Sequence, residues 1–544
     1  MSSPAHNASK VGVETLLEIH KLNVSINGKP ILNAIDLSLA KGDVLGIIGE
    51  SGSGKSMLAL SIMGLLPQGF ETTGQINFDQ QNLLQMSEAQ LCKLRGCDIS
   101  MVFQEPMTAL NPVLSIGKQV AECVKLHRRV SNKQALLIAE KTLEKVGLPV
   151  SQYPLSRYPH ELSGGQRQRV VIAMAIELQP ALLIADEPTT ALDVTTQAGI
   201  LELLKQLVVD EQLTLILVSH DLAVVNGIAD HIVIMRDGDV VERGDLKQLF
   251  KHSQHPYTRQ LIEASRHAPE RVEATIDAAP LLDVENLSCD YRMPRKNWWS
   301  KPGYFRAVKS VSLTIKRGES VGLVGESGCG KSTLTRALLG LMPIAEGEVR
   351  LHGERLEEGV LSHAVRREMQ VVFQDPYGSF NPRHKVKRLI AEPLHVLERT
   401  LTEQEQTTAV NDALVSVGLQ AEDAGKFIHE FSGGQRQRIA IARALIIKPA
   451  LIVLDEAVSA LDVSVRAQIL DLLSALAASH DIAYLFISHD LSVVRRVTDR
   501  VMVMQRGEIV ERGQTGAVFN SPTHPYTLEL LAATPKLPDE EREA

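Results

Sequence analysis

One eight-residue pattern, G-x-x-x-x-G-K-[ST], occurs twice in this chain and constrains its fold more than any other feature. The glycines let the backbone turn sharply and point its amides at an anion, and the following helix adds its positive end. The pattern is typical of a loop that binds nucleotide phosphates. Its two copies are Gly49-Glu50-Ser51-Gly52-Ser53-Gly54-Lys55-Ser56 and Gly325-Glu326-Ser327-Gly328-Cys329-Gly330-Lys331-Ser332.

The sequence around each copy supports this interpretation. An apolar, strand-like run precedes each loop, at residues 44–48 and 321–324, and a helical pattern follows, beginning near Met57 and at Thr333. A chance glycine-rich turn is the alternative, and one accidental match in a chain of this length has a probability on the order of a few per cent. Two matches with the same flanks are far less probable. The sequence therefore predicts two phosphate-binding loops, with lysines that reach the terminal phosphates and serines that hold Mg²⁺.

The two halves of the chain carry the same landmarks in the same order, offset by 269 or 270 residues. The pairs are Gln104 and Gln374, Ser163 and Ser432, Glu187 and Glu456, and His220 and His489. So long a period excludes a solenoid and indicates a duplicated domain. We predict an N-terminal tail at 1–15, a first domain at 16–265, a linker at 266–280, a second domain at 281–534 and a C-terminal tail at 535–544.

The composition argues against some classes of function. The net charge of −8 does not suggest an electrostatic nucleic-acid binder, and the five cysteines form no disulfide pattern. No apolar run reaches the roughly 18 residues that a membrane span needs. If the protein works at a membrane, another chain must carry the membrane part.

Two acidic residues end a short apolar run in each half, Asp186-Glu187 and Asp455-Glu456. The carboxyl ends of buried strands are where α/β sheets bind ligands. The first acid of each pair is suited to orient Mg²⁺ and the second to polarise an attacking water. Alone this pattern is weak evidence, but at matched positions after a phosphate-binding loop it is strong.

A serine and two glycines open a predicted helix in each half, which favours a second anion site. The alternative is an ordinary N-cap followed by flexible glycines, which is plausible for one copy but not for two in this order. The residues are Ser163-Gly164-Gly165-Gln166 and Ser432-Gly433-Gly434-Gln435.

Taken together, these motifs resemble the ATP-binding cassette (ABC) ATPases over nearly the whole chain. Within them, the chain is most similar to the fused two-cassette form of the peptide/nickel uptake family. The markers of this likeness are Phe103-Gln104-Glu105-Pro106, Phe373-Gln374-Asp375-Pro376, Leu110-Asn111-Pro112, Phe380-Asn381-Pro382, and the segments His255-Pro256-Tyr257-Thr258 and His524-Pro525-Tyr526-Thr527.

The resemblance implies an α/β fold of two tandem P-loop NTPase ABC nucleotide-binding domains. Each would have a RecA-like core, an antiparallel β subdomain and a helical subdomain that carries the signature serine. It also implies that the two domains pair head to tail around two ATP molecules. Lys55 would then share a site with Ser432, and Lys331 with Ser163.

The resemblance also assigns roles to single residues. Mg²⁺ would be held by Ser56, Gln104 and Asp186 in one site and by Ser332, Gln374 and Asp455 in the other. Glu187 and Glu456 would act on the water, His220 and His489 would contact the γ-phosphate, and Asp193 and Asp462 would lie in the loops that couple the sites.

The function that this resemblance implies is that of the ATP-hydrolysing motor of a bacterial importer of peptides. Its partners would be two transmembrane permeases and a periplasmic substrate-binding protein, with no nucleic acid, at the cytoplasmic face of the inner membrane. The alternative is a soluble tandem-cassette ATPase of translation. Such factors carry a long charged helical linker, which residues 245–280 do not resemble, and the acidic balance argues against an RNA partner.

This sequence departs from the family pattern at a few places. Tyr291 stands where an aromatic ring stacks on adenine, but its counterpart in the first half is Ile26, so the first site is expected to hold ATP less tightly. Ala457-Val458 replaces the Pro188-Thr189 of the first half, which we interpret as a family variant. The absence of a cysteine-rich tail predicts no iron–sulfur cluster. Both halves keep a full set of motifs, so we expect both sites to hydrolyse ATP.

An extra stretch in the second half, Met293 to Tyr304, contains both tryptophans of the protein. A surface hairpin with incidental aromatic residues is one interpretation. The other is a contact with a partner or a membrane interface, where tryptophan beside basic residues is favoured.

Overall fold

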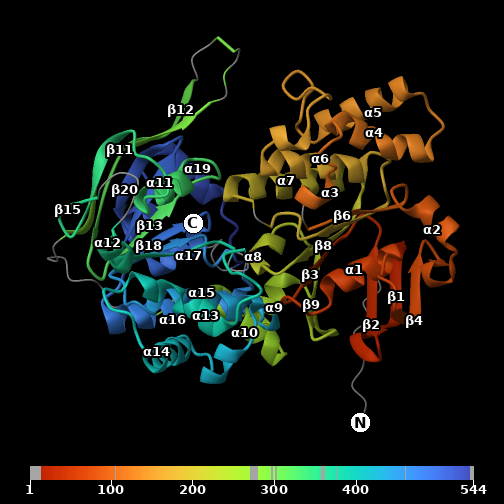
Figure 1. Cartoon of the computed structure of the whole chain (residues 1–544). Helices are drawn as coiled ribbons and strands as arrows, with labels where there is room; N and C mark the ends of the chain where they lie inside the picture. The colour runs from red at the N-terminus through yellow and green to blue at the C-terminus, as the bar shows by residue number, and fades with distance from the viewer. Residues whose placement is uncertain are drawn as a thin grey trace. The chain divides into compact units, whose positions relative to one another are not determined.

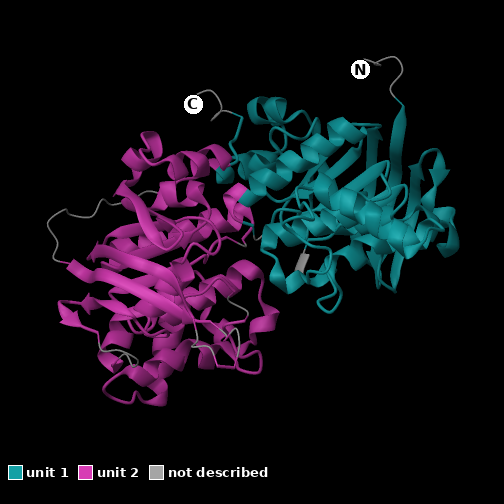
Figure 2. Cartoon of the chain, turned by 90° about the horizontal axis from the view of Figure 1, so that it is seen from above, with its two compact units in different colours: residues 1–192, 196–265, 535–544 teal, residues 193–195, 266–534 magenta. Residues whose placement is uncertain are grey.

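The computed structural model shows a chain that divides into two compact units (Figure 2). Unit 1 comprises residues 1–192, 196–265 and 535–544, and unit 2 comprises residues 193–195 and 266–534. The structure describes residues 14–104, 106–190, 192–269, 280–293, 295, 298–299, 303–356, 362–375, 378–459 and 461–538. Most of the predicted linker, residues 270–279, lies outside this range, so the predicted domain boundaries stay a prediction.

The core of unit 1 is a six-stranded sheet in the order β10-β9-β3-β8-β7-β6. All neighbours are parallel except the β9–β10 pair. Every residue of the four strands β3, β6, β7 and β8 is buried, as expected when both faces of a parallel sheet are covered. The strands are β3 (Val44–Ile48), β6 (Ile99–Val102), β7 (Leu182–Asp186), β8 (Thr214–Ser219), β9 (His231–Arg236) and β10 (Asp239–Gly244).

A second, antiparallel sheet covers part of this core, in the order β2-β1-β4-β5. Its strands are β1 (Thr15–Ile26), β2 (Lys29–Ala40), β4 (Phe70–Phe78) and β5 (Gln81–Asn82). Asn27 and Gly28 join β1 to β2 with φ angles of 51° and 74°, the left-handed turn that a two-residue hairpin requires. Leu17 and Ile19 of β1 belong to the same apolar cluster as Ile47 of β3.

The helices of unit 1 include a separate group, α4 (Ile116–His127), α5 (Asn132–Lys145) and α6 (Gly164–Ile176), which pack on one another (Figure 1). Ser131 and Gln134 form a capping box that starts α5. The remaining helices are α1 (Lys55–Met63), α2 (Glu88–Leu94), α3 (Pro106–Ala109), α7 (Val194–Glu211), α8 (Leu222–Val225), α9 (Leu246–His252) and α10 (Pro256–Arg266), with 3₁₀ turns at Leu83–Gln85 and Pro159–Glu161.

Unit 2 repeats this architecture with the same strand order in both sheets, β16-β17-β18-β13-β19-β20 and β12-β11-β14-β15. The core strands are β13 (Ser320–Val324), β16 (Met369–Val372), β17 (Leu451–Asp455), β18 (Ala483–Ser488), β19 (Arg500–Gln505) and β20 (Glu508–Gln514). The antiparallel strands are β11 (Pro280–Arg292), β12 (Tyr304–Lys316), β14 (Glu346–Leu351) and β15 (Glu354–Arg355).

The helices of unit 2 occur in a similar order along the chain. They are α11 (Lys331–Leu338), α12 (His363–Glu368), α13 (Val386–Ala391), α14 (Glu403–Ser416), α15 (Gly433–Leu445), α16 (Val463–His480), α17 (Leu491–Val497), α18 (Thr515–Asn520) and α19 (Pro525–Ala533), with 3₁₀ turns at Glu392–Val396, Ala421–Gly425 and Ile428–Glu430. The predicted duplication of an α/β domain with a RecA-like core, an antiparallel subdomain and a helical subdomain is confirmed.

The tryptophan-containing stretch joins β11 to β12. Trp298 and Trp299 are 79% and 74% exposed, and their ring centroids lie 4.7 Å apart. Residues 294, 296–297 and 300–302 of this stretch lie outside the described residues. Across the described ranges, no helix is both long and apolar enough to cross a membrane.

Candidate functional site

The first phosphate-binding loop connects β3 to α1 at the carboxyl end of the core sheet. Gly52 and Gly54 adopt φ angles of 83° and 100°, which favour glycine. A Cβ atom on Gly49 would lie 2.3 Å from the carbonyl oxygen of Met235, so the loop passes too close to β9 for a larger residue. Lys55 is buried, and its Nζ donates to the carbonyl oxygens of Gly49 and Glu50 at 2.8 and 2.9 Å. The lysine therefore lies inside the turn of the loop.

The second loop, between β13 and α11, has the same geometry. Lys331 Nζ donates to the carbonyl oxygens of Gly325 and Glu326 at 2.6 and 2.8 Å and lies 3.8 Å from Cys329 Sγ. Burial raises the pKa of the Cys329 thiol, although the charge of Lys331 opposes the rise. The agreement of the two loops in their contacts supports equivalent roles.

The strands β7 and β17 each end in an aspartate, buried in the case of Asp186 and half-buried in the case of Asp455. Asp186 is 5% exposed, and its Oδ1 has no hydrogen-bond partner among the described residues. Burial raises the pKa of Asp186, with a partial opposing effect from the Ser56 hydroxyl. Burial also raises the pKa of Asp455. A desolvated carboxylate beside a loop serine is an arrangement that a cation would stabilise.

Glu187 follows Asp186 in a strained left-handed conformation, with a φ angle of 46°, and its amide donates to the Val218 carbonyl at 3.0 Å. Its carboxylate is the meeting point of three site residues. Oε2 accepts from Gln104 Nε2 at 2.8 Å and from the Thr190 hydroxyl at 3.0 Å, and Oε1 lies 3.3 Å from His220 Nδ1.

The environment keeps this carboxylate ionised. Burial acts to raise the pKa of Glu187, but His220, Thr190 and Lys55 outweigh it and hold the pKa at about 2. The structure thus brings Gln104, Glu187 and His220 together, as expected for one site, and adds Thr190. The sequence analysis did not identify Thr190 as a site residue, although its position three residues after Glu187 could have indicated it.

Glu456 occupies the matching position in unit 2, with a φ angle of 50° and its Oε1 3.4 Å from His489 Nδ1. Burial acts to raise its pKa, and His489 and Lys331 reverse this so that the pKa is lowered. Ser459, the counterpart of Thr190, donates instead to the Glu456 carbonyl oxygen at 2.8 Å. The two glutamates are therefore held by different sets of contacts.

The predicted metal ligands of unit 2 line one cavity. Ser332, Gln374 and Asp455 all face a cavity of about 1030 Å³ that extends to Arg443 and His395 in the helical part of the unit. The residues that were predicted from separate motifs are therefore neighbours in space.

The signature serines begin the helices α6 and α15. Ser163 and Gln166 form a capping box, as do Ser432 and Gln435. A Cβ atom on Gly165 would lie 2.1 Å from Thr196 Cγ2, so this glycine is required for packing. A Cβ atom on Gly433 would meet open space, so packing does not explain that glycine. Gly433, the first residue of α15, therefore borders open space, and the role of these serines as anion sites stays a prediction.

Tyr291 on β11 is 37% exposed, and its hydroxyl lies 3.2 Å from the Thr333 hydroxyl of α11. The ring is thus tied to the helix that follows the phosphate-binding loop. Ile26 ends β1 opposite Lys29 and Phe70. Tyr291 and Ile26 therefore lie near the ends of equivalent strands, β11 and β1, and the expected difference in adenine stacking stays a prediction.

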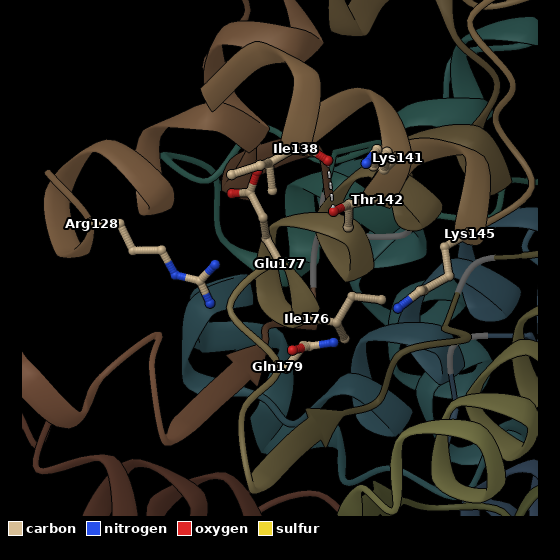
Figure 3. Close-up of a pocket in the computed structure, with 8 residues that line it drawn as sticks. All are labelled: Arg128, Ile138, Lys141, Thr142, Lys145, Ile176, Glu177 and Gln179. Atoms are coloured by element: carbon tan, nitrogen blue, oxygen red, sulfur yellow. Dashed lines mark hydrogen bonds between the residues drawn. The ribbon is translucent and has the colours of Figure 1, made fainter. Parts of the chain in front are cut away.

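A second, smaller cavity of about 190 Å³ lies among α4, α5 and α6, away from the loop (Figure 3). Its lining includes Arg128, Lys141, Lys145 and Glu177, which Figure 3 shows around it. Glu177 is 5% exposed, and neither carboxylate oxygen has a partner of good hydrogen-bond geometry among the described residues. Burial raises its pKa to about 8 against the opposing effects of Val124 and Arg128.

The order of strands defines the class of protein. A phosphate-binding loop after β3, a buried acid at the end of β7, and β8 between these two strands are the features of a P-loop nucleotide hydrolase with a RecA-like core. The pattern of the family described as "ABC transporter" matches residues 32–190 and 308–459. The chain belongs to this family, as an ATP-binding cassette ATPase. A further pattern, "Oligopeptide/dipeptide transporter, C-terminal region", matches residues 241–293 and 510–544.

The chain also has long curated relatives. It is 45% identical over 540 residues to the "Glutathione import ATP-binding protein GsiA" of Escherichia coli O6:H1, a match that covers 92% of this chain and 86% of that protein. It is 44% identical over 560 residues to the protein of the same name in Salmonella choleraesuis, which covers 96% of this chain and 89% of that protein. Both alignments include the two units.

Proposed function

We propose that this chain is the ATP-hydrolysing motor of a bacterial importer for glutathione or other short peptides. The observation that carries the proposal is the identity of 44–45% to glutathione import proteins over more than nine-tenths of the chain. The match to an oligopeptide transporter region in both halves favours a peptide cargo. The soluble translation factor is disfavoured, because these relatives are named for import.

The residues at the loop suit an ATP molecule with Mg²⁺. Ser56, Gln104 and Asp186 offer the hydroxyl, amide and carboxylate oxygens that Mg²⁺ prefers, and the unpartnered Oδ1 of Asp186 fits a cation. Ser332, Gln374 and Asp455 line one cavity of unit 2 and fit in the same way. When bound, Mg²⁺ supplies neutralisation of the phosphate charge.

The chain's own groups then perform the remaining tasks. The amides of residues 51–56 and 327–332 bind the phosphates, and the lysine ammonium of each loop donates to them. Glu187 and Glu456, both ionised, accept a hydrogen bond from the attacking water and orient it in line with the γ-phosphate. His220 and His489 hold these carboxylates and contact the same phosphate. Positioning and charge account for most of the rate of such reactions.

We further propose that the cassettes pair head to tail, so that Ser163 completes the site of Lys331 and Ser432 completes the site of Lys55. The capped helices behind both serines and the open space at Gly433 support a contact with phosphate there. Asp193 and Asp462 then lie where the two sites are coupled. A site that is complete only when the cassettes close makes closure depend on ATP.

The partners of this motor are two membrane permeases and a periplasmic binding protein, and its place is the cytoplasmic face of the inner membrane. The test is ATP hydrolysis by the purified chain, alone and then with candidate permeases and glutathione-binding protein in lipid vesicles. We expect stimulation by the loaded binding protein and little by the empty one. A chain with Glu187→Gln and Glu456→Gln is the control. If the chain alone is fully active and the membrane subunits do not change its rate, the coupling is refuted and the soluble-factor interpretation is favoured instead.

A further inference from the structure

The two His-Pro-Tyr-Thr segments begin the helices α10 and α19 at equivalent places. His255 Nδ1 accepts the amide of Tyr257 at 3.2 Å, and His524 Nδ1 accepts the amide of Tyr526 at 3.2 Å. The histidine thus fixes the first turn and the direction of the tyrosine that follows. The two segments make the same contact at the same distance, which indicates that they have the same role.

A glutamate from the edge strand of each core sheet holds the segment in place. Glu242 of β10 accepts the amides of Gln254 and His255 at 2.8 and 3.3 Å. Glu511 of β20 accepts the amides of Thr523 and His524 at 2.7 and 3.2 Å. Each segment is therefore anchored to the sheet that carries the phosphate-binding loop.

The tyrosines of these segments reach the phosphate-binding loops. The Tyr257 hydroxyl accepts the amide of Glu50 at 3.2 Å, and the Tyr526 hydroxyl accepts the amide of Glu326 at 2.9 Å. Both tyrosines are only 3% exposed. The Arg236 guanidinium lies 4.9 Å from the ring centroid of Tyr257, which further fixes that ring.

The loop residue whose amide contacts each tyrosine also contacts the loop lysine through its carbonyl oxygen. The carbonyl oxygen of Glu50 accepts from Lys55, and that of Glu326 accepts from Lys331. Each lysine ammonium has three N–H donors, so it can direct a donor to a phosphate when nucleotide binds. The tyrosine bond restrains the loop through the amide of this loop residue and does not involve the lysine.

We propose that Tyr257 and Tyr526 are positioning residues that keep each phosphate-binding loop open for nucleotide. A loop that is already in its binding shape avoids the cost of ordering when ATP arrives. The inference rests on the proposed ATP site. It gives the His-Pro-Tyr-Thr segments a task inside the cassette.

The test compares the full-length chain with its Tyr257→Phe and Tyr526→Phe double variant. Phenylalanine keeps the ring and removes only the hydroxyl. Loss of one such hydrogen bond is expected to weaken ATP binding roughly twofold to tenfold per site, measured by titration calorimetry with a non-hydrolysable ATP analogue. KM for ATP should rise by the same factor while kcat stays within about twofold, because the bond acts on binding.

Tyr484→Phe is the matched control. Tyr484 is also buried, and its hydroxyl donates to the Leu473 carbonyl at 3.1 Å, far along the chain from either loop. The Tyr484→Phe variant should have a lower melting temperature and an unchanged affinity for ATP. Unchanged affinity in the double variant, or a loss equal to that of the control, would overturn the inference while ATP binding by the wild-type chain keeps the proposed function. No ATP binding by the wild-type chain would overturn both.

Hydrogen exchange of the wild-type chain supplies a measurement that needs no variant. The amides of Glu50 and Glu326 should exchange more slowly than the amides of Gly52 and Gly328 in the same loops. Equal exchange within each loop would contradict the proposed restraint, even if the double variant did not fold.

Discussion

Glu177 is the group whose replacement gives the sharpest test of the physical argument. It is buried beside α4 and α5 and has no hydrogen-bond partner of good geometry within the described part of the chain, and its counterpart in the second half, offset by 269 residues, is Ile446. The second cassette therefore fills the equivalent place at the end of α15 with an apolar side chain. We predict that Glu177→Gln removes a pH-dependent loss of stability.

The magnitude can be worked out from the pKa. In the unfolded chain the carboxyl titrates near 4.5, and in the fold near 8, so the folded chain binds more protons between these values and becomes less stable as pH rises. The group's contribution is fully present below the unfolded pKa and is lost as pH rises through about 8. Between pH 5.5 and pH 9 the loss amounts to about 3 kcal/mol at most. For a domain of this size that corresponds to a melting-temperature change of roughly 6–12 °C.

The assay is differential scanning calorimetry of the full-length chain from pH 5.5 to pH 9. The quantity to follow is the difference in melting temperature between Glu177→Gln and wild type, because groups that titrate in both chains cancel. The difference should grow in favour of the variant as pH rises. Glu177→Ile, which copies Ile446, should show the same trend, and the exposed Glu144→Gln should show none. A difference that is flat with pH would refute the reasoning.

Further predictions concern the ATP sites. Glu187→Gln and Glu456→Gln should each lower the turnover of the full chain at least by half, measured as phosphate release, and a wild-type rate in either variant would mark that site as regulatory. In a Glu456→Gln background, Thr190→Ala should lower kcat roughly tenfold because Glu187 loses a hydrogen bond. Thr190→Ser keeps the hydroxyl and should keep kcat at the value of that background. Because the pKa of Glu187 is held at about 2, its protonation should cause no loss of hydrolysis as pH falls from 8 to 5. Ile26→Tyr, copying Tyr291, should tighten ATP binding at the first site roughly fivefold or more, and unchanged affinity in calorimetry would contradict the stacking argument.

Local signals and duplication in the sequence predicted two phosphate-binding loops with their flanking elements in a duplicated domain, and the family resemblance supplied the architecture within each domain. The run 44–48 coincides with β3, and the run before Glu187 forms β7, because buried parallel strands read as short apolar stretches whatever surrounds them. The predicted neighbours Gln104, Glu187 and His220 do meet.

The features that could not be predicted depend on contacts between distant segments. The Tyr257 hydroxyl meets Glu50 across 207 residues, and no local pattern encodes that distance. The burial of Glu177 could likewise not be predicted from the helical pattern around it, although its counterpart Ile446 is apolar and gives an indication. The roles of single residues in the ATP sites stay predictions.

The tryptophan stretch has a spectroscopic consequence. Trp298 and Trp299 are the two tryptophans of the chain, and both are about three-quarters exposed. Intrinsic tryptophan emission therefore reports on this one turn between β11 and β12 and is insensitive to melting of either core sheet. A blue shift of that emission on addition of a permease or of lipid vesicles would show that the turn has left water, in the unlabelled wild-type protein.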